Sequence, residues 1–471
     1  MGESKSLESI ILMSDAPIER SEGVSETEML LFELCDRAFL KLWTYPNPYK
    51  SDGHEMCDLI TVFDNHVFIF FDRHNKALER FEGDDITVPW NRWKKAAITK
   101  QLKTVSGAER YLRNPENKLF LDAKGTIPFP ISIKREDLII HKIIVAHGAA
   151  QACRDFSPEN VRGSLSVSYT NDVKGALDRP FHIALDNKDI VHVFDSDNLD
   201  IILSEFDTIA DLLLYFKAKE DAIKKTRHFW YAGEEDLISV YFRSFDEEAK
   251  EHHILPKNTD HDALMIEEGM WDTFVNSNAY KRRKIADQIS YHFDSLIQST
   301  SENALAGLTG GDPDIFNRPS AIKEMAKEPR YHRRALSEAM FGALEKFPNE
   351  PEEFYRNVGL YPSNEEGKYY VFLIVHFPGK SLEEGRGVKI EMLKLACGAA
   401  KLNFPHVRKV VGLAIEAPHL NEQTAEDYIL MEEGELHPEE VKYIREVNAE
   451  FNFFQSKNLK PTYKTTKQFP D

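Results

Sequence analysis

The sequence predicts an α/β protein with several domains, and three observations support this fold class. Two runs rich in Val, Ile and Phe flank a polar turn near residue 64, which is typical of a β-hairpin. Helical patterns dominate residues 226–347, and a strand–helix–strand pattern follows between residues 369 and 415. A length of 471 residues suggests roughly two to four domains. We expect an N-terminal domain with a mixed sheet at 1–225, a mainly helical region at 226–347 and a small α/β domain at 348–471.

The first predicted element is a helix that begins after residue 25. Ser25 and Glu28 form a capping-box pattern, in which the Ser is the N-cap and the Glu follows three residues later. The next apolar side chains recur at helical spacing and form one stripe: Leu30, Leu34 and Ala38. Glu33 lies beside this stripe, where it either faces a site next to the sheet or pairs with Arg37 one turn later. The sequence leaves both interpretations of Glu33 open.

A β-hairpin is expected after this helix. Asp64 and Asn65 are a strong turn signal, and we expect a loop of three residues, 64–66. Phe63 would then face the residue after the loop, and pairing outward along the strands would place Asp58 opposite Asp72.

The expected outer ends of the hairpin carry charged side chains. Because side chains alternate between the two faces of a strand, we expect His74 on the face of Asp72 and Arg73 on the other face. Two carboxylates a few ångströms apart in an apolar setting are costly unless a cation lies between them. A divalent metal with oxygen ligands is the usual answer. The alternative is an ordinary edge hairpin in which Asp58 and Asp72 are solvated.

This hairpin resembles the core of the PD-(D/E)XK nuclease superfamily, the restriction-endonuclease-like fold. In that family a first Asp opens one strand and an acidic-x-Lys triplet lies on the next strand. Asp58 matches the first Asp and Asp72 matches the second acidic position, whereas His74 stands where the family has its lysine. Arg73 and Lys76 are the nearest cations that could supply part of the missing charge.

The resemblance covers about residues 25–150 and implies a metal site. By analogy with the family, Asp58, Asp72 and a Glu on the preceding helix would hold Mg²⁺ (or Mn²⁺). We expect Glu33 in that role, with Glu28 as the second choice. The metal would activate a water molecule and stabilise the charge that develops during phosphodiester hydrolysis.

The segment after the hairpin is basic, although the whole chain has a net charge of −19. Residues 89–118 hold eight basic and two acidic side chains, and much of this segment reads as one helix over 91–113. Trp90 and Trp93 could add stacking to phosphate contacts. The alternative is a solvated amphipathic helix. The predicted nucleic-acid-binding residues are Arg92, Lys94, Lys95, Lys100 and Lys103.

One polar residue interrupts the apolar face of that helix. Gln101 lies between Ala97 and Val105 at helical spacing. Recombination-type nucleases, which the hairpin resembles, often carry a Gln on the helix after the acidic hairpin, facing the metal. The resemblance therefore adds Gln101 to the candidate catalytic residues, although the Tyr usual four residues later is Val105 here.

The rest of the chain alternates between strand and helix patterns. We expect a strand at 138–147, a hairpin-like pair at 190–194 and 199–203, and a helix at 207–216. The predicted central helices cover residues 234–245, 279–299 and 321–347, the last interrupted near Pro329. The strand–helix–strand pattern lacks any nucleotide-binding or nucleophile motif, so we expect a recognition or assembly role there. It covers residues 369–375, 388–402 and 409–415, with parallel strands.

Composition limits the remaining classes. The longest strongly apolar stretch, 369–376, is too short to cross a bilayer, so we expect no membrane partner. Four scattered cysteines form neither a zinc motif nor a disulfide framework, and no signal pattern follows Met1, so we expect a cytoplasmic protein. The segregation of basic and acidic segments also fits docking to a protein partner or a homo-oligomer.

Two functions follow from the sequence. The first is a metal-dependent nuclease, in which restriction of foreign nucleic acid, such as antiviral defence, would be the setting implied by the resemblance. The second is a catalytically inactive nuclease-like scaffold that binds protein or nucleic acid within a larger complex. The two differ in whether a lysine ammonium reaches Asp58 and Asp72.

Overall fold

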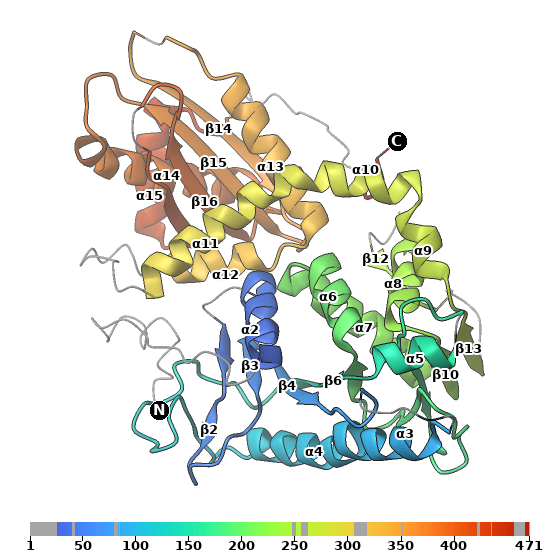
Figure 1. Ribbon diagram of the computed structural model, residues 1–471. Helices are drawn as coiled ribbons and strands as arrows, with labels where there is room; N and C mark the ends of the chain where they lie inside the picture. The colour runs from blue at the N-terminus through green and yellow to red at the C-terminus, as the bar shows by residue number, and fades with distance from the viewer. Residues whose placement is uncertain are drawn as a thin grey trace. The chain divides into compact units, whose positions relative to one another are not determined.

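The computed structural model contains two compact units, which we call unit 1, ending at Ser277, and unit 2, beginning at Asn278 (Figure 1). The multi-domain α/β fold class predicted from the sequence is confirmed. Residues 226–277 belong to unit 1 and 278–347 to unit 2, whereas the sequence suggested one helical region for both. The structure describes residues 26–39, 43–79, 83, 85–157, 159–246, 251–255, 262–305, 318–350, 352–421, 424–434, 436–455 and 467–470.

The first sheet of unit 1 has five strands in the order β1-β3-β4-β6-β9. Strand β3 pairs antiparallel with β1 and β4, whereas β6 is parallel to β4 and β9 is parallel to β6. The predicted hairpin and the predicted strand at 138–147 are confirmed. The strands are β1 (Thr44–Pro46), β3 (Leu59–Phe63), β4 (His66–His74), β6 (Ile139–His147) and β9 (His192–Phe194).

Helix α2 (Glu26–Phe39) precedes this sheet, as predicted. Ser25, the expected N-cap, lies outside the described residues. Strand β4 is buried continuously from Val67 to Asp72, which explains its unbroken apolar run, because a central strand covered on both faces does not alternate. A short pair, β2 (Tyr49–Lys50) with β5 (Leu119–Phe120), lies outside the main sheet.

The basic segment forms one long rod of three helical parts (Figure 1). These are α3 (Thr87–Lys94), a π-helical turn η1 (Lys95–Thr99) and α4 (Lys100–Arg113). The helix begins at Thr87 rather than at the predicted Asn91, and the Asp85 side chain accepts the Thr87 backbone N–H at 2.9 Å just before the first turn. The apolar face that binds this rod to the sheet is buried, as predicted.

The second sheet of unit 1 has the order β13-β10-β7-β8. Residues 199–203, predicted as a strand, belong instead to helix α6, because Asp195 caps that helix by accepting the Asn198 N–H at 2.9 Å. The remaining elements are α5 (Ala150–Phe156), β7 (Ser166–Thr170), β8 (His182–Asp186), α6 (Ser196–Glu205), α7 (Ile209–Lys225), β10 (His228–Tyr231), α8 (Glu234–Arg243), β11 (Phe245–Asp246), β12 (Glu251–His252), β13 (Ala263–Ile266) and α9 (Met270–Val275).

A fully buried ion pair lies in the core of unit 1. The Lys219 ammonium on α7 is 2.6 Å from both carboxylate oxygens of Glu234, and it lies 4.9 Å from the centre of the Tyr231 ring. Burial lowers the pKa of Lys219, while Glu234 opposes that change. The pair joins helix α7 to the start of α8. Both side chains are fully buried, so water cannot solvate either charge if its partner is removed.

Unit 2 has a four-stranded sheet in the order β14-β15-β16-β17. The predicted strand–helix–strand unit is confirmed, with β15 parallel to β16. The predicted helix at 279–299 is divided by a 3-10 turn at 288–290, and Pro329 interrupts the third helix, as expected. The elements are α10 (Asn278–Asp287), α11 (Tyr291–Leu305), α12 (Arg318–Ala326), α13 (Arg330–Glu345), β14 (Tyr355–Pro362), β15 (Lys368–His376), α14 (Leu382–Asn403), β16 (Lys409–Glu416), β17 (Asp427–Met431) and α15 (Pro438–Phe451).

Buried ion pairs join helix and sheet in unit 2. Lys389 of α14 lies 2.5 Å from Glu416 of β16 and 3.0 Å from Asp427 of β17. Lys368 of β15 pairs at 3.0 Å with Glu328, which follows α12. Removing one member of such a pair leaves the other charge buried, so the pairs restrict how helix and strands can rearrange.

Candidate functional site at the strand ends of unit 1

The hairpin register differs from the prediction by one residue. Phe63 pairs with His66, because the loop contains two residues rather than three. Asp64 has a φ of 55°, a left-handed conformation that Asp tolerates, and this lets the chain reverse within two residues. A shift of one residue exchanges the faces of a strand. The prediction that Asp58 lies directly opposite Asp72 is therefore wrong.

Asp58 is instead bound by protein donors. Its carboxylate accepts the backbone N–H of Asp72 at 2.6 Å and the Arg73 guanidinium at 2.9 and 3.2 Å. Arg73 also donates to the backbone carbonyl of Asp72. The lysine expected in the family has no counterpart in these contacts, and an arginine provides the positive charge at Asp58.

Like charges surround Asp58 at this end of the sheet. Burial raises the pKa of Asp58 to about 6, although the Arg73 charge and the Asp72 N–H oppose this, and Glu28 adds to the rise. Burial also raises the pKa of Glu55 to about 7, with further contributions from Asp58 and Glu28. The acidic residue of α2 that acts on Asp58 is thus Glu28, the second choice of the sequence prediction.

Asp72 has a separate set of partners. One carboxylate oxygen accepts the Thr27 hydroxyl at 2.6 Å, and the other lies 2.8 Å from Nε2 of His147. Nδ1 of His147 is 2.6 Å from the Ser196 hydroxyl, and the Trp93 indole N–H donates to the His147 carbonyl at 2.9 Å. An Asp–His–Ser hydrogen-bond chain therefore connects strand β4, strand β6 and the first residue of α6.

The parallel strands explain this convergence. Strands β4 and β6 are in register from their first to their last residues, with His74 beside His147. Strand β9 runs parallel to β6 and leads into α6, which begins with Ser196. The carboxyl ends of adjacent parallel strands are the usual location of sites in α/β sheets. Asp72, His147 and Ser196 all come from such ends.

The other predicted catalytic residues are dispersed. Glu33 is exposed on α2, and Lys76 is exposed beyond β4. His74 lies 2.6 Å from Glu79 instead of facing a carboxylate of the hairpin. Gln101 is buried on α4, and its side-chain oxygen has no hydrogen-bond partner among the described residues. Gln101 is thus buried without a described hydrogen bond to its side-chain oxygen, and it does not join Asp58 or Asp72 in a shared set of contacts.

The arrangement does not fit the shared Mg²⁺ (or Mn²⁺) ion expected from the sequence. Within the described part of the chain, neither Asp58 nor Asp72 belongs to a group of three metal-binding side chains whose ligand atoms lie within 4.8 Å of one another. Asp58 already accepts bonds from Arg73, and Asp72 from Thr27 and His147. A metal at either carboxylate would have to displace these donors.

The basic rod presents most of the predicted nucleic-acid-binding residues to solvent. Lys94 differs, because it is less exposed and forms an ion pair with Asp178 at 3.1 Å. Trp90 and Trp93 are buried and stack on each other at 5.3 Å, so the expectation that they stack on bases is wrong. Among the described residues, no acidic side chain pairs with the four exposed cations. These are Arg92, Lys95, Lys100 and Lys103.

Sequence reasoning missed His147, Ser196 and Thr27. His147 ends a predicted strand, and Ser196 follows a residue that favours helix starts. The available signal was the polar residue at each strand end. These polar residues could not be assigned to one site from the sequence, because the parallel pairing of β4, β6 and β9 brings them together.

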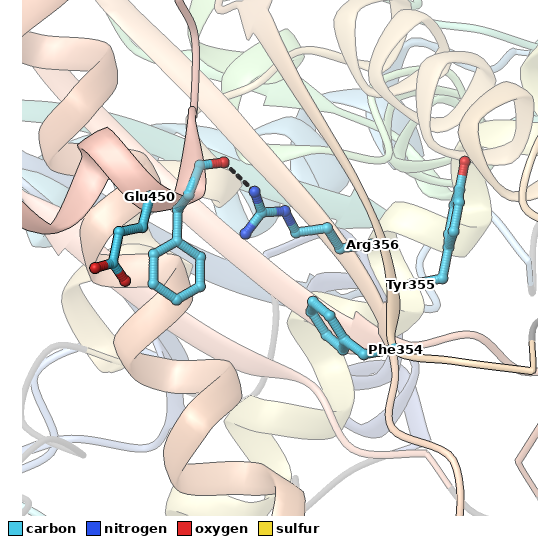
Figure 2. A pocket seen from close by; sticks show the side chains of 5 residues that line it. Phe354, Tyr355, Arg356 and Glu450 are labelled. Carbon is cyan, nitrogen blue, oxygen red and sulfur yellow. Dashed lines mark hydrogen bonds between the residues drawn. The ribbon is translucent and has the colours of Figure 1, made fainter.

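Unit 2 has an open hollow of about 460 Å³ (Figure 2). The Arg356 guanidinium donates to the backbone carbonyl of Phe451 and lies 5.1 Å from the centre of that ring. The hollow thus combines aromatic area with one cation and one carboxylate, and the guanidinium already donates one bond to this carbonyl. Its lining residues are Phe354, Tyr355, Arg356, Glu450 and Phe451.

Comparison of the chain with family models, curated proteins and solved structures finds no match to any of the three. In the parts of the chain that the structure describes, no helix combines the length and the apolar character needed to cross a membrane.

Proposed function

We propose that unit 1 is a nuclease-like scaffold that binds nucleic acid through the exposed face of the rod α3–η1–α4. The observation that supports this most is the row of four solvent-exposed cations without a described acidic partner, in a chain with a net charge of −19. Acidic side chains are abundant enough to neutralise such a row. A polyanion such as a nucleic-acid phosphate backbone would form ion pairs with all four of these cations.

The π-helical turn supports this proposal by aligning the cations. In a regular α-helix, residues five apart point in directions about 140° different. Here the Lys100 backbone N–H bonds to the Lys95 carbonyl, an i→i+5 bond that stacks Lys100 about one turn above Lys95. From Arg92 to Lys103 the row extends about 16 Å, roughly five phosphate spacings along one strand.

Phosphodiester hydrolysis at the neighbouring strand ends is the second candidate. It is favoured by the raised pKa values of Asp58 and Glu55, because acids with perturbed pKa values cluster at active sites. The Arg73 contact with Asp58 counts against it. An inactive scaffold therefore agrees better with the geometry than a nuclease does.

A binding experiment tests the first proposal. The full chain is titrated into fluorescent single- and double-stranded DNA and RNA between about 50 and 200 mM NaCl, and the slope of log K against log salt is measured. The test variant replaces the four exposed cations of the rod by Ala. The control variant removes four exposed lysines from other parts of unit 1: Lys124, Lys174, Lys188 and Lys217.

We expect each lost phosphate contact to reduce the slope by about 0.7–0.9, and the control variant to keep the wild-type slope. Equal slopes for the two variants, or no binding by the wild type, would refute the proposal. Incubating plasmid and oligonucleotides with Mg²⁺, Mn²⁺ or EDTA then decides whether hydrolysis accompanies binding. Cleavage that requires metal and is lost in Asp58→Asn would favour the second candidate.

A further inference from the structure

Three side chains with nitrogen and oxygen ligand atoms meet at the other end of the first sheet. Nδ1 of His141 lies 3.1 Å from Oε1 of Glu220, and Nε2 of His192 lies 3.4 Å from the same oxygen. All three ligand atoms lie within 4.8 Å of one another. Both histidines are almost fully buried, and the Glu220 side chain is 18 % exposed.

The fold fixes these side chains from three elements. His141 belongs to β6 and His192 to β9, and the parallel register pairs Ile143 with His192. Because residues two apart on a strand share a face, both imidazoles point to the same side of the sheet. Phe216, one turn before Glu220 on α7, stacks on the His192 ring at 4.3 Å and packs at a tilt against the His141 ring at 5.4 Å. The rings are therefore held in place by packing.

The two separations between Glu220 and the histidines are close to the edges of a metal-centred tetrahedron. Zinc–nitrogen and zinc–oxygen bonds of about 2.0–2.1 Å place neighbouring ligand atoms about 3.3–3.4 Å apart. The contact between His192 and Glu220, at 3.4 Å, is long for a hydrogen bond, which is usually about 2.9–3.0 Å. Hydrogen bonding alone accounts for the 3.1 Å contact between His141 and Glu220. It accounts less well for the 3.4 Å contact between His192 and Glu220.

The surroundings also fit a metal site. Nε2 of His141 lies 3.0 Å from Nδ1 of His66, and a metal-bound histidine usually hydrogen-bonds through its other nitrogen. Nδ1 of His192, the nitrogen that faces away from Glu220, is buried with no partner among the described residues, so only His141 has this outer hydrogen bond. The second oxygen of Glu220 lies 3.2 Å from Lys224, which leaves one oxygen for the metal.

We propose that His141, His192 and Glu220 bind one Zn²⁺ ion. Two histidines and one carboxylate suit zinc rather than magnesium, because imidazole nitrogen is a poor ligand for Mg²⁺. Three protein ligands leave the fourth position to water, which the partial exposure of Glu220 makes reachable. His141 and His147 are six residues apart on β6, about 20 Å, so this site is separate from the Asp72–His147–Ser196 chain.

Metal titration of the full chain tests the proposal. After EDTA treatment and dialysis, we expect one equivalent of Zn²⁺ to raise the melting temperature and one equivalent of Co²⁺ to give the visible absorption of a four- or five-coordinate ion. Mg²⁺ alone should produce no rise. Absence of stoichiometric Zn²⁺ and Co²⁺ binding by the wild-type chain would overturn the proposal.

Variants locate the ion. His192→Ala should abolish the Co²⁺ spectrum, and Glu220→Gln, which keeps a hydrogen-bond acceptor at a partly exposed position, should weaken binding if His192→Ala fails to fold. Both substitutions should lower the affinity for Co²⁺ more than His66→Ala does. His66→Ala removes only the hydrogen-bond partner of His141, and we expect it to lower the affinity roughly 10- to 100-fold. The matched control is His182→Ala, a buried histidine of the second sheet that is hydrogen-bonded to two serines. Unchanged binding in folded Glu220→Gln would assign the ion to another site and overturn the proposal.

Discussion

Replacing Asp58 by Asn should stabilise unit 1 above pH 6. The Asp58 carboxyl is buried, and its pKa is raised from 3.8 to about 6, mainly by burial and despite the Arg73 charge. The neutral Asn keeps an oxygen that can accept the Asp72 N–H. The substitution removes the negative charge, which burial makes unfavourable in the folded state. Arg73, which is 35 % exposed, can be solvated when its partner is lost.

The magnitude follows from the difference in pKa between the folded and unfolded states. A raised carboxyl pKa means that the folded state binds the proton more tightly, so its contribution to stability is present below pH 3.8 and is lost as pH rises through 6. Each pKa unit corresponds to about 1.4 kcal/mol, so the loss approaches about 3 kcal/mol above pH 6. The difference between Asp58→Asn and wild type should therefore be near zero at pH 4 and grow to about that value at pH 7.

Tryptophan fluorescence during urea unfolding measures this quantity for unit 1 alone. All the tryptophans of the chain lie before Ser277: Trp43, Trp90, Trp93, Trp230 and Trp271. Unfolding free energies are compared between pH 4 and pH 8 for wild type, Asp58→Asn and the control Asp200→Asn, whose side chain is exposed on α6. The control should follow the wild type at every pH.

Parallel pH dependence of wild type and Asp58→Asn would refute the argument, because it would mean that burial does not change the ionisation of Asp58. A further variant separates charge from hydrogen bonding. At pH 4, Asp58→Ala should be about 1–3 kcal/mol less stable than Asp58→Asn, because the Asp72 N–H loses its acceptor.

Three further predictions concern the core of unit 1. Lys219→Met should reduce the free energy of unfolding by about 3–5 kcal/mol by leaving Glu234 buried without its cation, and adding Glu234→Gln should recover part of this in the same urea assay. Burial raises the pKa of Glu235 from 4.5 to about 8, so Glu235→Gln should be close to neutral at pH 4.5 and increasingly stabilising as pH rises to 8, as measured by thermal melts. Gly163→Ala should lower the melting temperature, because Gly163 has a φ of 72° and its added Cβ would lie 2.1 Å from the Ala150 carbonyl oxygen, and hydrogen–deuterium exchange should increase locally.

Elements with one clear periodicity could be predicted from the sequence. The apolar run of β6 and the amphipathic pattern of α4 each fit a single type of structure, and both elements were found where expected. The segment 199–203 was misassigned, because Leu199, Ile202 and Leu203 satisfy a short strand pattern as well as a helical one. The Asp195 cap decides between them, and its effect depends on the side-chain geometry.

The candidate site was only partly predictable. Asp58, Asp72 and Arg73 were identified as a charged group at the strand ends, and the structure gives Arg73 as the partner of Asp58. The register depended on whether Asp64 accepts a positive φ, which changes the loop by one residue. The partners His147 and Ser196 are 75 and 124 residues along the chain from Asp72, and only parallel packing of the strands brings them together.

The π-helical turn at Lys95–Thr99 also has a consequence for changes in chain length. A π-turn closes over one more residue than an α-turn, so it is equivalent to a single-residue insertion in a regular helix. Deleting one residue there, such as the exposed Thr99, should convert the rod into a continuous α-helix while its two ends remain nearly in place. The same deletion within α4 would rotate everything after it by about 100° and turn the buried Leu112 away from the core. Unit 1 should therefore tolerate the loss of a residue in this turn, but not one helical turn further along.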